Sequence, residues 1–202
     1  MIRFQVRKAA PFRIEDAQIA SSPGVSAPDG QEYVVVQARR DIVAEYEQVC
    51  AAAGAYAGAV GLATLNVVNA VLGSGSPPSG DWLLIHVDAD AATLAILRGE
   101  HVVFFRHRGA DGEGHLAELV HQTAMYYQDR LGGQGFARAL VAGALPDDKE
   151  GVMKRAFETR LGVPVEHIDI TRAVPLADRM GPSRELVDAL TPALGLALAQ
   201  HF

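Results

Sequence analysis

The pattern of hydrophobic and polar residues predicts alternating strands and helices in the first 72 residues. Apolar and polar side chains alternate over residues 2–6, which predicts a half-buried strand. A β-branched run at 33–36 predicts a buried strand, whereas the turn-rich stretch 21–30 predicts a long loop. A helix is expected from an N-cap at Asp41 to Gly54, with an apolar face made of Ile42, Tyr46, Val49, Cys50 and Ala53. A strand over 57–61 and a helix over 62–72 complete this part.

The remaining chain carries a second, more regular pattern. Strands are expected at 82–87, 93–97 and 101–106, and their short connections indicate a meander. A helix follows over 114–131, and further elements are expected at 139–142 (strand), 149–161 (helix), 163–168 (strand) and from Ser183 (helix, broken at Thr191-Pro192). The order β-β-β-α-β-α-β-α predicts a mixed sheet with helices on its faces, which is an α/β domain.

Residues 73–80 separate the two parts. They read Gly-Ser-Gly-Ser-Pro-Pro-Ser-Gly, a composition that cannot bury a core and is typical of a linker. We therefore expect a first domain over 1–72 and a second over 81–202.

Composition and charge limit the classes of function. The chain has 202 residues, of which 49% are hydrophobic and 21% charged, as in a globular protein. A formal net charge of −6 argues against nucleic acid as a partner. The single cysteine, Cys50, excludes an internal disulfide framework. No apolar run reaches the length of a membrane span and the N-terminus does not read as a signal peptide, so a cytoplasmic protein without membrane insertion is expected.

Few residues suggest chemistry by spacing alone. His115, Glu118 and His121 recur every third residue of an expected helix, which favours a solvated face over a metal site. The glycine-rich segment 73–80 lacks a following Lys-Ser or Lys-Thr and is not a P-loop. Asp88 and Asp90 follow a buried strand, where carboxylates often bind Mg²⁺.

Five stretches, taken in order, carry a resemblance that covers nearly the whole chain. They are 8–12 with Glu15-Asp16, 34–40 with Tyr46 and Ala53-Gly54, 66–70, 84–98 with 104–106, and 140–144. In this order they resemble the PilM-like family of type IV pilus assembly proteins, which belongs to the actin-like ATPases of ribonuclease H-like fold. The resemblance implies an actin-like second lobe over 81–202, in which 84–98 is the phosphate-binding hairpin and 140–144 the adenosine-side turn. A small inserted-type α/β subdomain and a remnant of the first lobe would precede it.

The positions that would contact a nucleotide depart from the family pattern. The family's phosphate turn reads Asp-x-Gly-x-x-Thr-Thr, whereas here His86 falls at the aspartate and Asp88 at the glycine, with Asp90 and Thr93 beyond them. An aspartate at that glycine crowds and repels phosphate. The glycine pair of the adenosine turn is reduced to Gly143-Ala144, and no counterpart of the family's first phosphate strand is recognised. We therefore expect no nucleotide cofactor and no metal, with Asp88 and Asp90 as loop residues.

The resemblance implies a non-catalytic scaffold. In this interpretation the chain is cytoplasmic and binds the cytoplasmic tail of an inner-membrane PilN-type protein in a type IV pilus assembly platform. One alternative is an ATP-binding actin-like ATPase represented here by a fragment that lacks the N-terminal phosphate-binding half-lobe. Another is a secretion platform protein of the GspL type.

Two sets of surface residues follow from this interpretation. The segment before Gly54 corresponds to the subdomain beside which the family binds its partner, and it offers cations, a proline turn and an aromatic anchor in Arg7, Lys8, Pro11, Phe12 and Arg13. In the alternative, Phe12 packs inward and the cations are solvated. If the first lobe's opening strands are absent, an exposed apolar patch would support self-association through Val60, Leu62, Leu65, Val68 and Leu72.

Overall fold

The contacts between residues divide the chain into two units, Met1–Leu62 and Ala63–Phe202. The computed structural model describes residues 2–28, 30–75, 79–109, 115–143, 151–170 and 183–199. The division falls before helix α3 (Ala63–Gly73), not in the expected linker at 73–80. The physical reason is that α3 packs into the core of the second unit through Val67, Val68, Ala70 and Leu72.

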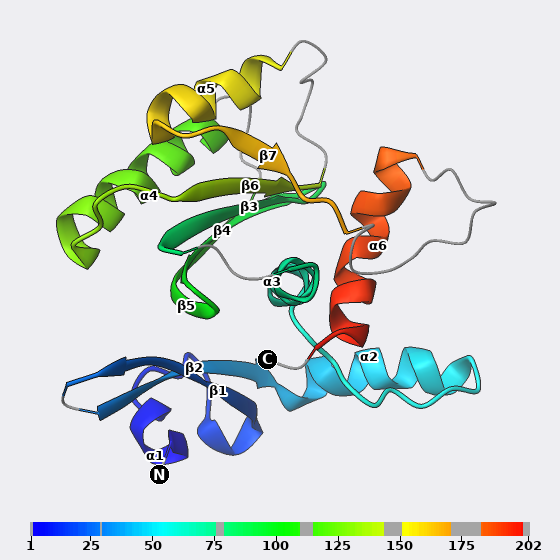
Figure 1. Cartoon of the computed structure of the whole chain (residues 1–202). Coiled ribbons are helices and arrows are strands. Elements are labelled where there is room, and N and C mark those ends of the chain that lie inside the picture. Colours follow the sequence, from blue (N-terminus) through cyan, green and yellow to red (C-terminus); the bar gives the residue numbers. More distant parts are fainter. Residues whose placement is uncertain are drawn as a thin grey trace. The chain divides into compact units, whose positions relative to one another are not determined.

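A five-stranded mixed sheet forms the frame of the second unit (Figure 1). Its strands are β3 (Asp81–Val87), β4 (Ala91–Arg98), β5 (His101–Gly109), β6 (Arg138–Ala142) and β7 (Val165–His167), in the order β5-β4-β3-β6-β7. The first three pair antiparallel as a meander, and β6 and β7 add in parallel beside β3. The α/β fold class expected from the sequence is confirmed.

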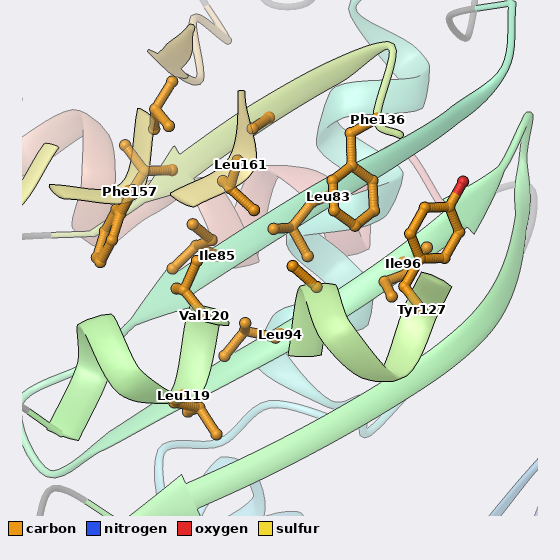
Figure 2. Packing of buried hydrophobic residues seen from close by; sticks show 14 of the residues in the cluster. Leu83, Ile85, Leu94, Ile96, Leu119, Val120, Tyr127, Phe136, Phe157 and Leu161 are labelled. Atoms are coloured by element: carbon orange, nitrogen blue, oxygen red, sulfur yellow. The ribbon is translucent and has the colours of Figure 1, made fainter. Parts of the chain in front are cut away.

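Alternate side chains of the central strands pack into two separate hydrophobic cores, one on each face of the sheet. Leu83, Ile85, Leu94 and Ile96 point to the face covered by α4 (His115–Leu131) and α5 (Val152–Leu161), where Figure 2 shows them meeting Leu119, Val120, Tyr127, Phe157 and Leu161. Trp82, Leu84, Ala95, Leu97 and Leu140 point to the opposite face, against α3 and α6 (Arg184–Ala197). Because both faces are covered, these strands are apolar over most of their length, and that pattern made them recognisable in the sequence.

Helices α3 and α6 pack closely because Gly195 has no side chain. A Cβ atom at Gly195 would lie 1.7 Å from the carbonyl oxygen of Asn66, so the α6 backbone rests directly on α3. Ser183 caps the N-terminus of α6, where a helix was expected to start, and its hydroxyl accepts the Leu186 N–H. The expected break at Thr191-Pro192 is wrong, since the helix continues through Pro192. The Thr191 hydroxyl donates to the Val187 carbonyl at 2.7 Å and is fully buried.

The first unit contains a hairpin and three helical segments. They are α1 (Ile2–Val6), a 3-10 turn η1 (Ile14–Asp16), the antiparallel pair β1 (Ala17–Ala27) and β2 (Gly30–Arg39), and α2 (Arg40–Ala52). Four expectations are wrong here: residues 2–6 are helical, most of 21–30 is strand, 33–36 lie in a strand that has no buried residue, and 57–61 is not a strand. Five alternating residues are too few to fix a strand when no described strand pairs with them. β1 has the composition of a loop and extends because β2 offers it a hydrogen-bonding edge.

Helix α2 departs from the expectation in its start and its burial. Arg39 is the residue before the helix, and Asp41 lies within the first turn instead of at the N-cap. None of its residues is buried, and Ile42, Tyr46 and Val49 are exposed. No helix in the described part of the chain is long and apolar enough to cross a membrane.

Candidate functional site

A pocket of about 540 Å³ lies in the first unit, where η1, the start of β1 and the junction of β2 with α2 meet. Ala17 and Arg39 pair across the hairpin, and this pairing brings the segment before β1 to the start of α2. The pocket combines one aromatic, three cationic and two acidic side chains: Phe12, Arg13, Asp16, Arg39, Arg40 and Asp41.

Two of the three arginines are held by neighbouring groups. The Arg39 guanidinium donates two hydrogen bonds to the Asp41 carboxylate, and the one from Nε measures 3.0 Å. This hydrogen bond lowers the pKa of Asp41 below its usual value, so the carboxylate stays ionised at neutral pH. Arg40 donates from Nη2 to the uncharged Ala17 carbonyl at 3.2 Å, and no described carboxylate forms an ion pair with it. The pocket therefore presents positive charge beside an aromatic ring.

The structure places the expected partner-binding residues in two groups. Phe12 and Arg13 line the pocket, whereas Arg7, Lys8 and Pro11 are exposed and do not line it. The sequence analysis missed Asp16, Arg39, Arg40 and Asp41. A signal was present, because Arg39-Arg40-Asp41 stands where a β-branched run passes into a helix, but only the hairpin pairing shows that these residues face Phe12.

The turn that would hold phosphate lies between β3 and β4. It is closed by its own groups: the Asp88 N–H donates to the Ala91 carbonyl at 2.8 Å, and the Asp88 carboxylate accepts the Ala89 N–H at 2.7 Å. Asp88 and Asp90 are exposed. Asp88 thus contributes a carboxylate and not an open amide where the family pattern has glycine.

His86 and Thr93 are paired side by side in the sheet and are both committed to internal hydrogen bonds. His86 Nδ1 lies 2.8 Å from the Thr64 hydroxyl of α3, and Thr93 Oγ1 lies 2.9 Å from His107 Nδ1 of β5. Burial lowers the pKa of His86, although the negative charges of Asp88 and Asp188 act to raise it. A neutral imidazole therefore stands at the position where the sequence resemblance led us to expect an aspartate, and a neutral imidazole is a poor ligand for Mg²⁺.

Gly143, the remaining glycine of the adenosine turn, is required by packing. Its φ is 84° and a Cβ atom there would lie 1.9 Å from the Val87 carbonyl oxygen, so it rests on the end of β3. Ala144 lies outside the described residues. Among the described side chains, no group of three or more His, Cys, Asp or Glu residues is arranged to hold a metal ion.

The apolar residues expected to form an exposed patch for self-association are not all exposed in this structure. Leu65, Val68 and Leu72 are buried in the second unit, because α3 is covered on its apolar side. Val60 and Leu62 are exposed and belong to the first unit. These five residues therefore do not form one exposed patch, and that expectation is corrected.

Comparison with known proteins gives likeness in structure but not in sequence. No protein-family model matches the chain, and no curated protein matches it. It is similar to a solved chain of a "PilM-PilN type IV pilus biogenesis complex", with a TM-score of 0.79 and 17% identity over 98% of this chain and 70% of that one. It also matches a Bacteroides thetaiotaomicron protein of actin-like ATPase fold and unknown function, with a TM-score of 0.48 and 8% identity over 82% of this chain and 58% of that one. The chain thus shares the fold of that PilM-PilN complex chain, in keeping with the α/β class predicted from the sequence.

Proposed function

We propose that this chain is a scaffold of a type IV pilus assembly platform, which binds the cytoplasmic tail of a PilN-type inner-membrane protein in the pocket of its first unit. The observation that carries the proposal is the pocket itself, in which Phe12 and Arg13, selected from the sequence, lie together with Arg39 and Arg40. The likeness to a solved PilM-PilN complex chain supports the kind of partner.

The lining predicts what the tail must present. A half-buried aromatic ring beside arginine is a composition found at binding hot spots. Among the described residues, Arg40 has no carboxylate partner, and the one ion pair of Arg13 is a 3.9 Å contact with Glu15. A tail that fits would therefore place an apolar side chain on Phe12 and a carboxylate between Arg13 and Arg40, where a charge-assisted hydrogen bond forms.

The scaffold is proposed to act without nucleotide hydrolysis. The support comes from the turn between β3 and β4, where Asp88 adds negative charge and His86 is held by Thr64. A carboxylate at that place repels the phosphates of ATP. In this proposal the protein is cytoplasmic and reaches the inner membrane through its partner.

A binding assay with single variants tests the proposal. A fluorescein-labelled peptide of the partner's N-terminal tail is titrated with the chain and its anisotropy is measured. Phe12→Ala and Arg40→Ala are each expected to weaken binding by about tenfold, as loss of a central anchor does. Tyr56→Ala and Arg130→Ala are matched controls, exposed and outside the pocket, and should leave the affinity unchanged. Equal affinity of all four variants would refute the assignment of the pocket.

A further inference from the structure

The outer edge of the five-stranded sheet carries an unpaired basic strand. β5 is nine residues long and pairs with β4 along one edge, and no strand among the described residues pairs with its other edge (Figure 1). An open edge presents a row of N–H and C=O groups that an extended chain can pair with.

The side chains of β5 give this edge a positive charge. Residues 101–109 contain no acidic residue, and Arg106, His107 and Arg108 follow one another near the end. Their register partners on β4 are Leu94, Thr93 and Ala92, none of which is charged. In the described part of the chain, neither Arg106 nor Arg108 forms an ion pair with a carboxylate. The two guanidinium charges are therefore available to a partner.

Aromatic rings lie beside these charges. The Arg106 guanidinium lies 5.4 Å from the centre of the Phe104 ring, which in turn lies 5.0 Å from the ring of Tyr126 on α4. Phe105 points to the other face of the sheet, on the side of Ala95, and is 40% exposed. The edge thus has arginines on one face and an exposed phenylalanine on the other.

This arrangement selects among possible occupants. A second copy pairing edge to edge in the register centred on His107 would bring Arg106 of each copy against Arg108 of the other, and like charges opposite each other are destabilising. Because β5 contains no acidic residue, no other register of β5 against itself gives these arginines a carboxylate. A strand with carboxylates on one face meets those arginines instead. Because side chains alternate along a strand, the residue between two such carboxylates would lie on the face of Phe105.

We propose that the edge of β5 binds an acidic extended segment by strand addition, and that the segment reads acidic-apolar-acidic. The two carboxylates would contact Arg106 and Arg108, and the apolar residue would contact Phe105. The site lies in the second unit and is independent of the pocket proposed for the PilN-type tail.

The experiment uses a fluorescein-labelled ten-residue peptide of alternating Glu and Val. We expect the chain to bind it, and Arg106→Gln/Arg108→Gln to weaken binding by about tenfold, in line with the loss of two exposed charge pairs. Arg130→Gln/Arg160→Gln removes equal charge from α4 and α5 and should change the affinity less than twofold. Circular dichroism and melting temperature show that both variants fold. Should the edge variant unfold, Phe105→Ala is the second variant, and it is also expected to weaken binding of the Glu-Val peptide.

Two further probes separate strand addition from charge attraction alone. The same peptide with every backbone amide N-methylated keeps its charges but cannot donate hydrogen bonds to the edge, and it should bind at least tenfold more weakly. A Lys-Val peptide should not bind. Equal binding of the methylated peptide, tighter binding of a single-stranded DNA oligonucleotide, or dimerisation through Arg106 and Arg108 would each overturn the proposal, as would no binding of the Glu-Val peptide. Phe12→Ala should leave this binding intact, which separates it from the function proposed for the pocket.

Discussion

The Thr64 hydroxyl lies 2.8 Å from Nδ1 of His86, across the gap between the first turn of α3 and the end of β3. This hydrogen bond holds a neutral imidazole at the position that the sequence resemblance assigned to the aspartate of a phosphate turn. His86 is 9% exposed and Thr64 5% exposed, so neither is a free ligand. The turn beyond them is closed by Asp88 on its own backbone.

From this geometry we expect no stabilisation by ATP. A ligand present at a hundredfold excess over its Kd stabilises a protein by about 2.7 kcal/mol. Melting curves recorded with and without millimolar Mg-ATP should superimpose. The double variant His86→Asp/Asp88→Gly introduces the residues of the family pattern. If Mg-ATP raises the melting temperature of that variant alone, these two residues account for the absence of ATP binding in the unaltered chain. A rise of about 5 °C or more in the unaltered chain would contradict the scaffold proposal.

The buried imidazole predicts a loss of stability in mild acid. The folded state lowers the pKa of His86 through burial, so the unfolded chain takes up its proton first as the pH falls below about 6.5. The free energy of unfolding should therefore decrease between pH 7 and pH 5. Urea unfolding of His86→Gln should show a weaker decrease over this range, whereas the exposed His121→Gln should behave like the unaltered chain. If the unaltered chain and both variants lose stability equally between pH 7 and pH 5, His86 is not the residue responsible.

Burial of Leu65 predicts unfolding from a substitution that a surface would tolerate. Its side chain is 7% exposed, and an aspartate there would bury a charge without a partner. Leu65→Asp should lower the free energy of unfolding by about 3 kcal/mol or more, measured by denaturant titration. Leu62→Asp changes an exposed residue three positions earlier and should change the free energy of unfolding by less than about 0.5 kcal/mol. Similar unfolding midpoints for the two variants would show that α3 is not covered.

Close packing of α3 and α6 depends on Gly195. A Cβ atom there would lie 1.7 Å from the Asn66 carbonyl oxygen, so the helices must separate to admit it. We expect Gly195→Ala to destabilise the protein by about 1–3 kcal/mol despite the better helix propensity of alanine. Gly58→Ala adds the same methyl group where nothing lies within 4 Å and serves as the control. A stabilising effect of Gly195→Ala would refute this contact.

The second unit was predictable because its signals are local. The central strands are largely apolar and covered on both faces, so a segment such as 82–87 can be recognised from its sequence alone. The first unit gives weaker signals. β1 contains Ser21, Ser22, Pro23 and Gly24, a composition that indicates a loop, and only pairing with β2 makes it a strand. Arg39 and Arg40 join Phe12 through that pairing, a long-range contact that no local pattern reveals.

Amide hydrogen exchange with and without the partner's tail tests the central claim most directly, because it locates the bound peptide on the chain. The tail is expected to slow exchange at residues 12–17 and 39–42, which surround the pocket, and to leave β3 and β4 unchanged. Phe12→Ala should abolish this protection, and Tyr56→Ala should preserve it. Protection confined to the second unit, or none at a tail concentration that saturates binding, would contradict the account.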